Sequence, residues 1–281
     1  MHRPDPLNIL ISWAYWKQVD WDLIRRKQKE MNLRIFLDCG ANTLLTSGGK
    51  KQFPLKDYCD WIKEYEDIFW GYLQLDVIYD GVKTRRNYDY MKEQGLNPIP
   101  IFTIGSKMED LNYFWSQSDL VAFGGCKEIR NRLVYGEAIV KLARQRNKHV
   151  HILGMNDFKL INIWRPYSCD SISWFSTQMY GNVSYLEDDC LKTYHRSKGS
   201  IPEGLISAMK IYGFDLKALY DEKCWRSHKG TVYMQQLSAC IWVRLMRGFY
   251  NRGINVWLVA GDKNSINHAL DAYERDYTVY P

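Results

Sequence analysis

Short apolar segments alternate with longer amphipathic segments through the first 170 residues of the chain. The apolar segments have the length and composition of buried strands, and the amphipathic ones repeat apolar side chains at helical spacing. We predict strands at residues 8–14, 33–37, 70–77, 98–104, 119–123, 149–153 and 167–170. We predict helices at residues 21–31, 54–67, 83–94, 108–116, 130–146 and 157–164. This alternation over short connections is typical of a parallel sheet with crossover helices.

Acids and glycines gather after these strands rather than before them. Each strand from the second to the seventh is followed by one or the other, beginning with Asp38 and ending with Asp170. In a (β/α)8 barrel the carboxyl ends of the strands form the face that carries the active site. An open doubly wound sheet gives the same alternation but concentrates its site at one switch point. We therefore predict an α/β fold of the (β/α)8 TIM-barrel type.

The alternation changes after residue 170. We expect a strand of a small hairpin at residues 180–186, helices at 201–212 and 235–250, and the eighth strand at 254–260. No internal repeat or clear linker separates these segments from the rest. We interpret residues 1–281 as a single TIM-barrel domain, with an elaboration at about 176–253 after the seventh strand.

Composition excludes a disordered chain and leaves the partner open. Apolar residues make up 46% of the sequence and aromatic residues 15%, which is enough to bury a large core. The formal charge of +6 suits a polyanionic partner, but it suits a basic protein without one equally well. The seven cysteines are scattered, and the sequence shows neither a leader-like N-terminus nor a long apolar run. We expect reduced thiols and a cytoplasmic location.

A carboxylate at the end of a buried strand is how many α/β enzymes present a reactive group. Asp38 precedes the small residues Cys39, Gly40 and Ala41, which allow a tight turn. Each acid taken alone has a plainer explanation, because acids also end strands, cap helices and accept hydrogen bonds in loops. The functional interpretation depends on several such residues meeting at one end of the sheet.

Five motifs, each after a predicted strand, resemble those of the tRNA-guanine transglycosylase superfamily in their order. Within that superfamily the chain looks most like the compact phage-type DNA-guanine transglycosylases, which insert a 7-deazaguanine into DNA. The resemblance covers about half of the chain. The motifs are Leu-Asp-Cys-Gly-Ala-Asn at 37–42, Leu-Asp-Val at 75–77, Phe-Gly-Gly-Cys at 123–126, His-Ile-Leu-Gly-Met at 151–155 and Cys-Asp-Ser-Ile-Ser-Trp at 169–174.

The resemblance implies a TIM barrel and assigns a role to each motif. Asp170 corresponds to the nucleophile and Asp38 to the general acid/base. Asp76 corresponds to the acid that hydrogen-bonds to the guanine edge. The implied base-binding residues are Gly124 and Gly125, whose backbone contacts the base, and Leu153, which forms one wall of the base slot. No cofactor is required, the free 7-deazaguanine base (preQ0- or preQ1-like) is a substrate, and the implied partner is DNA, with tRNA as the alternative.

The chain departs from the family pattern at three places. Asn42 stands where the family usually has an aromatic residue that stacks on the base, and Thr103 stands where the tRNA enzymes have a glutamine. The Cys-x-Cys-x-x-Cys zinc motif of the tRNA enzymes is missing, which favours DNA over tRNA. Another set of cysteines and histidines could still bind zinc. We do not favour it, because its spacing differs from that of the tRNA enzymes and scattered cysteines and histidines often coincide by chance. It comprises Cys190, His195, Cys224 and His228.

Base exchange would require the target nucleotide to be flipped out or single-stranded, because a duplex hides C1′ and the base edge. Basic residues in or after the strand-to-helix loops could hold phosphates, although solvated loop charges explain each of them equally well. They are Lys50, Lys51, Arg85, Arg86, Arg130 and Arg132. Two alternatives remain open. One is a tRNA transglycosylase or a nucleic-acid N-glycosidase, and the other is a non-catalytic barrel that binds nucleic acid or a free deazapurine.

Overall fold

The computed structural model describes residues 5–47, 53–103, 105–125, 132–188, 190–195, 197, 199–221, 223–224 and 227–281, except for the side chains of residues 132 and 133. The chain forms two compact units. The first comprises Met1–Asp170 with Ile254–Asp262, and the second comprises Ser171–Gly253 with Lys263–Pro281. Each unit is described separately below.

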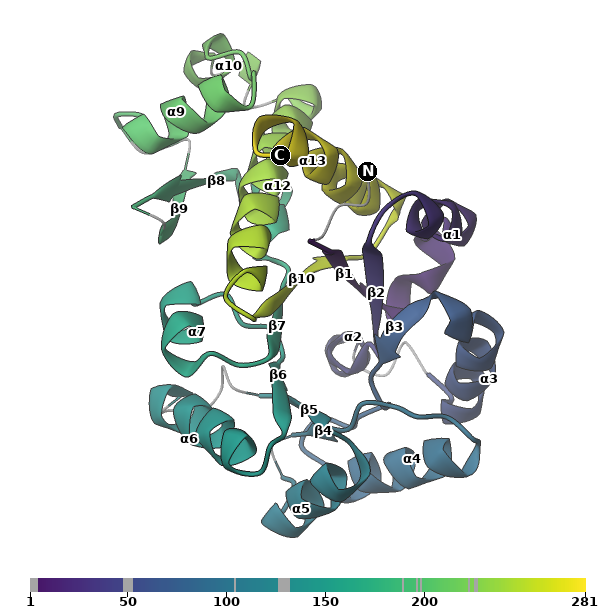
Figure 1. Ribbon diagram of the computed structural model, residues 1–281. Coiled ribbons are helices and arrows are strands. Elements are labelled where there is room, and N and C mark those ends of the chain that lie inside the picture. Colours follow the sequence, from purple (N-terminus) through teal and green to yellow (C-terminus); the bar gives the residue numbers. More distant parts are fainter. Residues whose placement is uncertain are drawn as a thin grey trace. The chain divides into compact units, whose positions relative to one another are not determined.

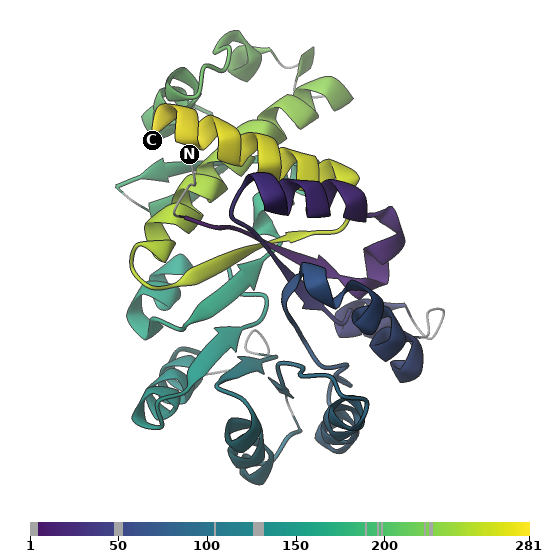
Figure 2. The same ribbon diagram turned by 45° about the vertical axis from the view of Figure 1, so that its right-hand side comes forward.

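The first unit is built on an eight-stranded parallel sheet. Its order is β3-β2-β1-β10-β7-β6-β5-β4 (Figure 1). The strands are β1 (Leu7–Ser12), β2 (Leu33–Asp38), β3 (Phe69–Tyr72), β4 (Ile101–Phe102), β5 (Leu120–Phe123), β6 (His149–Ile152), β7 (Ser168–Ser171) and β10 (Asn255–Ala260). The sheet curls, as Figure 2 shows, and β10 fills the position of the predicted eighth strand between β1 and β7.

The curled sheet is compatible with a (β/α)8-type fold, but regular strand pairing does not close it into a barrel. Its edge strands, β3 and β4, are joined by a single parallel bridge between Leu73 and Ile99. The Ile99 N–H donates to Tyr72 O at 2.8 Å, and Gln74 N–H donates to Ile99 O at 3.1 Å. Prolines 98 and 100 flank this bridge and have no N–H to donate, so the strand predicted at 98–104 shortens to two residues. The prediction of a fully closed barrel is therefore wrong in this detail.

The strands are continuous apolar runs because both faces of the sheet are covered. Ile9, Ile35 and Val121 are completely buried in three different strands. Helices lie on the outer face of the curl, which is the arrangement that parallel strands with helical crossovers require (Figure 1). They are α1 (Trp21–Glu30), α3 (Leu55–Tyr65), α4 (Gly81–Glu93), α5 (Met108–Gln117), α6 (Arg132–Gln145) and α7 (Phe158–Trp164).

Aspartates fix the beginnings of three of these helices. Asp20 accepts a hydrogen bond from Leu23 N at the start of α1, as expected from the sequence. Asp80 likewise accepts from Lys83 N at the start of α4, and Asp157 accepts from Leu160 N at the start of α7. Each of these carboxylates satisfies a backbone N–H that has no partner within its helix.

The second unit is a hairpin packed with helices. Strands β8 (Asn182–Glu187) and β9 (Cys190–His195) pair antiparallel, which confirms the predicted hairpin. The helices are α8 (Ser176–Tyr180), α9 (Glu203–Ile211), α10 (Lys217–Tyr220), α12 (His228–Tyr250) and α13 (Lys263–Val279). The buried Asp276 on α13 accepts hydrogen bonds from Arg247 Nη1 at 2.7 Å and from Tyr212 Oη at 2.5 Å, which ties α13 to α12 and to the end of α9.

None of the helices in the described part of the chain combines the length and the apolar character that a membrane crossing needs.

Gly136 on α6 lies against the ring of Trp164 at the end of α7. A Cβ at residue 136 would lie 2.5 Å from Trp164 Cη2 and 2.6 Å from its Cζ2. Trp164 is almost completely buried, so its ring has no space into which to move. We expect Gly136→Ala to lower the free energy of unfolding by about 1–3 kcal/mol, measured by chemical denaturation.

Gly248 on α12 provides the control for this substitution. A Cβ there would meet only Arg252 Nη2, at 3.7 Å. Alanine is the better helix former, so Gly248→Ala should leave stability unchanged or raise it by up to about 1 kcal/mol. Equal stability of Gly136→Ala and the wild type would contradict the close packing of α6 against Trp164.

Candidate active site

Three acids from separate strands lie at the carboxyl end of the parallel sheet. Asp38 is the last residue of β2, Asp170 is the third residue of β7, and Asp76 follows the bridge that extends β3. Burial is the largest influence that raises the pKa of Asp38. The nearby negative charges of Asp76 and Asp170 raise it further. Asp38 therefore lies within electrostatic reach of both other acids.

Asp38 occupies a tight turn built around glycine. The Gly40 N–H donates to Asp38 Oδ2 at 3.0 Å. Gly40 has φ of +83°, and a Cβ there would lie 3.0 Å from Ala14 Cβ, Phe53 Cε2 and Ser12 Oγ. A larger residue would have to displace these atoms and adopt a strained backbone, so the turn requires glycine. It holds the carboxylate at the strand end, where the residue as a whole is half-buried while its carboxyl group lies deep enough for burial to dominate its pKa.

Ser12 is the neighbour of Asp38 in the sheet. The two residues are in register between β1 and β2. The Ser12 hydroxyl is buried, and it contributes to lowering the pKa of Asp38. Among the described residues it has no partner at full hydrogen-bond geometry, so it remains able to donate to Asp38 or to a bound group.

Asp76 is held by a thiol that the sequence analysis did not identify. Cys39 Sγ donates to Asp76 Oδ1 at 3.0 Å. Cys39 is completely buried, and burial raises the pKa of its thiol well above the ordinary range, so the sulfur keeps the proton that it donates. Burial also raises the pKa of Asp76. The position of Cys39, directly after Asp38, was the only sequence signal for this contact.

Asp170 is held through one of its oxygens, which has two nitrogen neighbours. Asp170 Oδ1 accepts from Gly154 N–H at 2.9 Å and lies 3.2 Å from His151 Nε2. The other ring nitrogen, His151 Nδ1, lies 2.8 Å from Ser168 Oγ. Both His151 and Ser168 are completely buried. From the sequence, residue 151 could be predicted only to lie in a strand, because a histidine in an apolar strand has no periodic signal of its own.

The residues expected to form the base slot gather at β4, β5 and β6. A Cβ on Gly124 would lie 3.6 Å from Thr103 Oγ1 and 3.7 Å from Leu153 Cδ1, so these three residues are neighbours. The Gly124 N–H already donates to Phe102 O at 3.0 Å. A backbone contact to a base would therefore fall to Gly125, which has a positive φ of 78°.

Asn42 lies in the short helix α2 (Ala41–Thr46), and its side chain is exposed. Its backbone carbonyl accepts from Thr46 Oγ1. The structure thus places Asn42 directly after the Asp38 turn, on a different segment from Thr103 and Gly124. Nothing in its contacts supplies the stacking ring that an aromatic residue would provide.

The basic residues expected near the site have different surroundings. Arg85 is held by Asp89 and Asp110 and lies over the ring of Tyr113, so its guanidinium is already engaged. Arg86 is exposed on α4. Lys50, Lys51 and Arg130 lie outside the described residues, as does the side chain of Arg132.

The candidate zinc ligands do not assemble into a site within the part of the chain that the structure describes. Cys190 and His195 are the first and last residues of β9. A strand rises by about 3.3 Å per residue, which separates these two residues by more than one metal ion can span. No group of three or more His, Cys, Asp or Glu side chains arranged to hold a metal occurs among the described residues.

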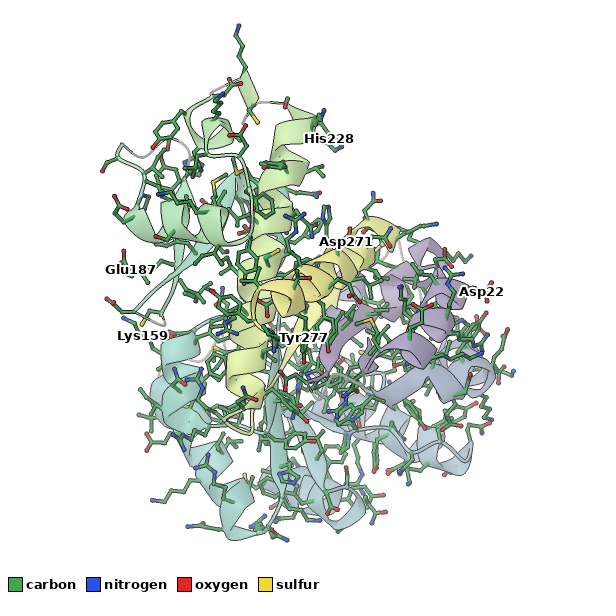
Figure 3. All side chains as sticks on the ribbon, turned by 45° about the horizontal axis from the view of Figure 1, so that its top comes forward. Asp22, Lys159, Glu187, His228, Asp271 and Tyr277 are labelled. Atoms are coloured by element: carbon green, nitrogen blue, oxygen red, sulfur yellow. The ribbon has the colours of Figure 1, made fainter. Side chains whose placement is uncertain are left out.

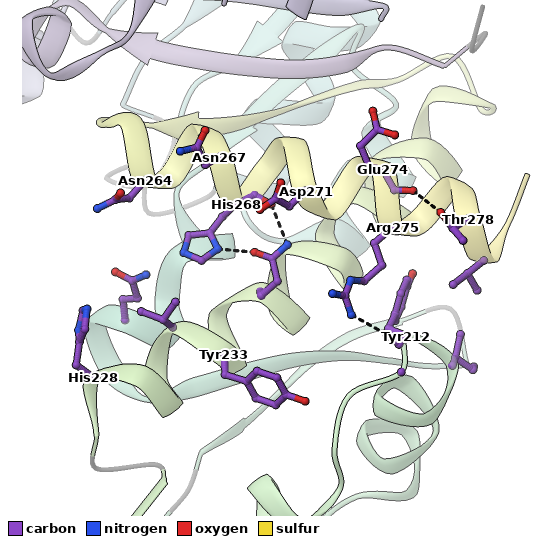
Figure 4. Close-up of a pocket in the computed structure, with 16 residues that line it drawn as sticks. Tyr212, His228, Tyr233, Asn264, Asn267, His268, Asp271, Glu274, Arg275 and Thr278 are labelled. Carbon is purple, nitrogen blue, oxygen red and sulfur yellow. Dashed lines mark hydrogen bonds between the residues drawn. The ribbon is translucent and has the colours of Figure 1, made fainter. Parts of the chain in front are cut away.

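A pocket of 1050 Å³ lies within the second unit, and none of the three acids is among the residues that line it. His228 on α12 and Asp271 on α13 are among the residues that line it, and both are labelled in Figure 3. Its polar side chains are partly paired with one another, since His268 contacts Gln236 and Arg275 donates to Tyr212 O (Figure 4). The pocket has no grouping of nucleophile and base comparable to the acids of the first unit.

Comparisons of the chain with protein-family models, with curated proteins and with solved structures find no match.

The raised pKa of Asp38 predicts how stability depends on pH. Asp38 has a pKa of about 7 when folded, against an ordinary value of 3.8, so between about pH 4 and pH 7 the folded chain binds more protons than the unfolded chain. Stability should therefore fall as the pH rises through this window, because the unfolded state gains from ionisation first. Asp38→Asn removes this loss, and we expect it to exceed the wild type in unfolding free energy by about 2–4 kcal/mol at pH 8 and to match it near pH 4.

The measurement is chemical denaturation of both proteins at pH 4, 6 and 8. Asp119→Asn is the control, because the pKa of this exposed acid is lowered by its hydrogen bond to Lys148. The stability of Asp119→Asn relative to the wild type should therefore fall, not rise, as the pH increases. A pH-independent difference between Asp38→Asn and the wild type would show that Asp38 is ionised throughout.

Proposed function

We propose that this protein exchanges guanine in nucleic acid, preferably DNA, for a 7-deazaguanine through a covalent glycosyl ester on Asp170. The observation that carries the proposal is the meeting of Asp38, Asp76 and Asp170 at one end of the parallel sheet, with the pKa of Asp38 raised to about 7. A carboxyl group with a pKa near 7 is suited to give and take protons at neutral pH.

In the first half-reaction Asp170 acts as the nucleophile. Its second oxygen, Oδ2, attacks C1′ of the target nucleotide, and the bond between C1′ and guanine N9 breaks. The bonding electron pair leaves with the guanine, and protonated Asp38 supplies the proton that neutralises it. The products are free guanine, the Asp38 carboxylate and a glycosyl ester on Asp170.

The second half-reaction reverses these steps with a new base. The Asp38 carboxylate removes the N9 proton of the incoming 7-deazaguanine, and that nitrogen attacks C1′. The ester C–O bond breaks, and its electron pair returns to Asp170 as a carboxylate. Two inversions at C1′ retain the configuration, as in retaining glycosidases.

Asp76 supplies selectivity for the base. The guanine edge presents the N1–H and the N2 amino group as donors, and an ionised carboxylate accepts both, whereas adenine offers no such pair. Because Cys39 donates to Oδ1, the thiol orients the Asp76 carboxylate. A buried carboxylate left without donors is costly, so the wrong base would be rejected strongly.

DNA is the favoured substrate because the chain lacks the zinc motif of the tRNA enzymes. The charge of +6 suits DNA and tRNA equally, since both are polyanions. The nucleotide must be unpaired to reach the acids, so single-stranded or flipped DNA is the expected form.

The test is an exchange assay with labelled guanine and separate DNA and tRNA substrates. Label in DNA supports the proposal, and label in tRNA alone contradicts the preference for DNA. Release of guanine without incorporation of label, also when free 7-deazaguanine is present, would identify a hydrolase instead. Binding of the nucleic acid without release or exchange would identify a non-catalytic barrel.

A further inference from the structure

Oδ1 of Asp170 is the acceptor in both of its contacts. The Gly154 backbone can only donate, and its N–H points at Oδ1 from 2.9 Å. His151 Nε2 approaches the same oxygen at 3.2 Å. If Nε2 carried a lone pair instead of a hydrogen, two acceptors would face each other in a completely buried position, at a large cost in free energy. The geometry therefore requires a hydrogen on Nε2.

Ser168 accommodates this tautomer on the other side of the ring. Its hydroxyl lies 2.8 Å from His151 Nδ1 and can either donate or accept. With the ring hydrogen on Nε2, Nδ1 is an acceptor, and the Ser168 hydroxyl donates to it. The β6–β7 register, which pairs His151 with Ser168, builds this contact into the sheet.

We infer that His151 is a positioning residue that fixes the Asp170 carboxylate through Nε2–H, while Ser168 anchors the other ring nitrogen. Oδ1 is occupied by two donors, so Oδ2 is the oxygen presented for reaction. His151 makes no covalent bond and transfers no proton in this role. Its hydrogen bond orients the carboxylate before attack and stabilises the same carboxylate when the ester bond breaks. This role in reactivity rests on the proposed function, whereas the tautomer does not.

The first experiment measures the tautomer without any substrate. Nitrogen-15 NMR of the imidazole groups shows which nitrogen of His151 carries the hydrogen. We expect the hydrogen on Nε2 in the wild type and also in Ser168→Ala, because the contact with Asp170 Oδ1 persists in the variant. A hydrogen found on Nδ1 alone in the wild type would overturn the inference.

The second experiment uses a pair of variants that separate the two ring nitrogens. His151→Gln can place its amide donor near the position of Nε2, whereas His151→Asn reaches only the position of Nδ1. With a guanine-containing oligonucleotide, we expect adduct formation to slow by ~10- to 100-fold in His151→Asn and by less than ~5-fold in His151→Gln. Equal losses in the two variants, or full activity of His151→Asn, would contradict the positioning role.

His149 provides the matched control, because it lies two residues away on the same strand, is exposed, and packs on Tyr167. His149→Gln should react at the wild-type rate, and thermal melting should show that all variants fold. If the wild type forms no adduct while NMR places the hydrogen on Nε2, the proposed chemistry fails and the structural role of His151 stands. If the adduct forms but the hydrogen lies on Nδ1, the inference about His151 fails alone.

Discussion

Asp170→Asn is expected to abolish formation of a covalent adduct between the protein and a guanine-containing oligonucleotide. An amide is a far weaker nucleophile than a carboxylate, so the rate should fall by about 10⁴-fold or more. The contacts that hold the side chain can survive the substitution, because the asparagine carbonyl can still accept from the Gly154 N–H. The loss should therefore come from chemistry rather than from unfolding.

The adduct is measured by denaturing electrophoresis after incubation with labelled single-stranded DNA and no incoming base. Asp157→Asn is the control, because Asp157 caps α7 through Leu160 N and asparagine caps a helix equally well. This variant should form the adduct at the wild-type rate. An adduct that persists in Asp170→Asn would remove Asp170 from the role of nucleophile.

Asp76→Asn is expected to destroy discrimination in favour of guanine. The substitution replaces one acceptor oxygen with an amide donor, which then faces the N1–H or the amino group of guanine. A site built to pair with specific donors loses several orders of magnitude when that pairing fails, so guanine exchange should fall by about 10²–10⁴-fold. Cys39 can still donate to the remaining oxygen, which preserves the local packing.

The comparison is made between exchange of guanine and exchange of purines that lack the N2 amino group. Asp80→Asn is the control, since Asp80 lies four residues away and caps α4 through Lys83 N. Asp80→Asn should keep the wild-type ratio between the bases. Unchanged selectivity in Asp76→Asn would show that Asp76 does not contact the base edge.

The strand positions could be predicted because buried parallel strands are continuous apolar runs. Ile9, Ile35 and Val121 mark such runs, and the segment at 254–260 was recognised as the last strand by the same property. The lengths of β3 and β4 could not be predicted, since the extent of a strand depends on which backbone groups of its neighbour face it. The prolines at 98 and 100 were visible, but their effect on closure depends on the opposite edge of the sheet.

The acids of the site could be located because each follows a strand, and parallel strands bring their carboxyl ends together. The residues that hold these acids in place could not be located from the sequence, because each of their contacts joins positions distant in sequence. Cys39 and Asp76 are 37 residues apart, and His151 and Asp170 are 19 apart. Arg85 illustrates the same difficulty. Its position in the sequence allowed either a phosphate contact or a solvated charge, whereas the structure pairs it with Asp110, which is distant in sequence.

The most direct test of the central claim is peptide mapping by mass spectrometry of the adduct formed with a guanine-containing oligonucleotide. We predict a sugar bonded to the peptide that contains Asp170, together with one equivalent of free guanine, and loss of the sugar when a 7-deazaguanine is added. A sugar found on any other residue, or release of guanine with no modified peptide, would contradict the account.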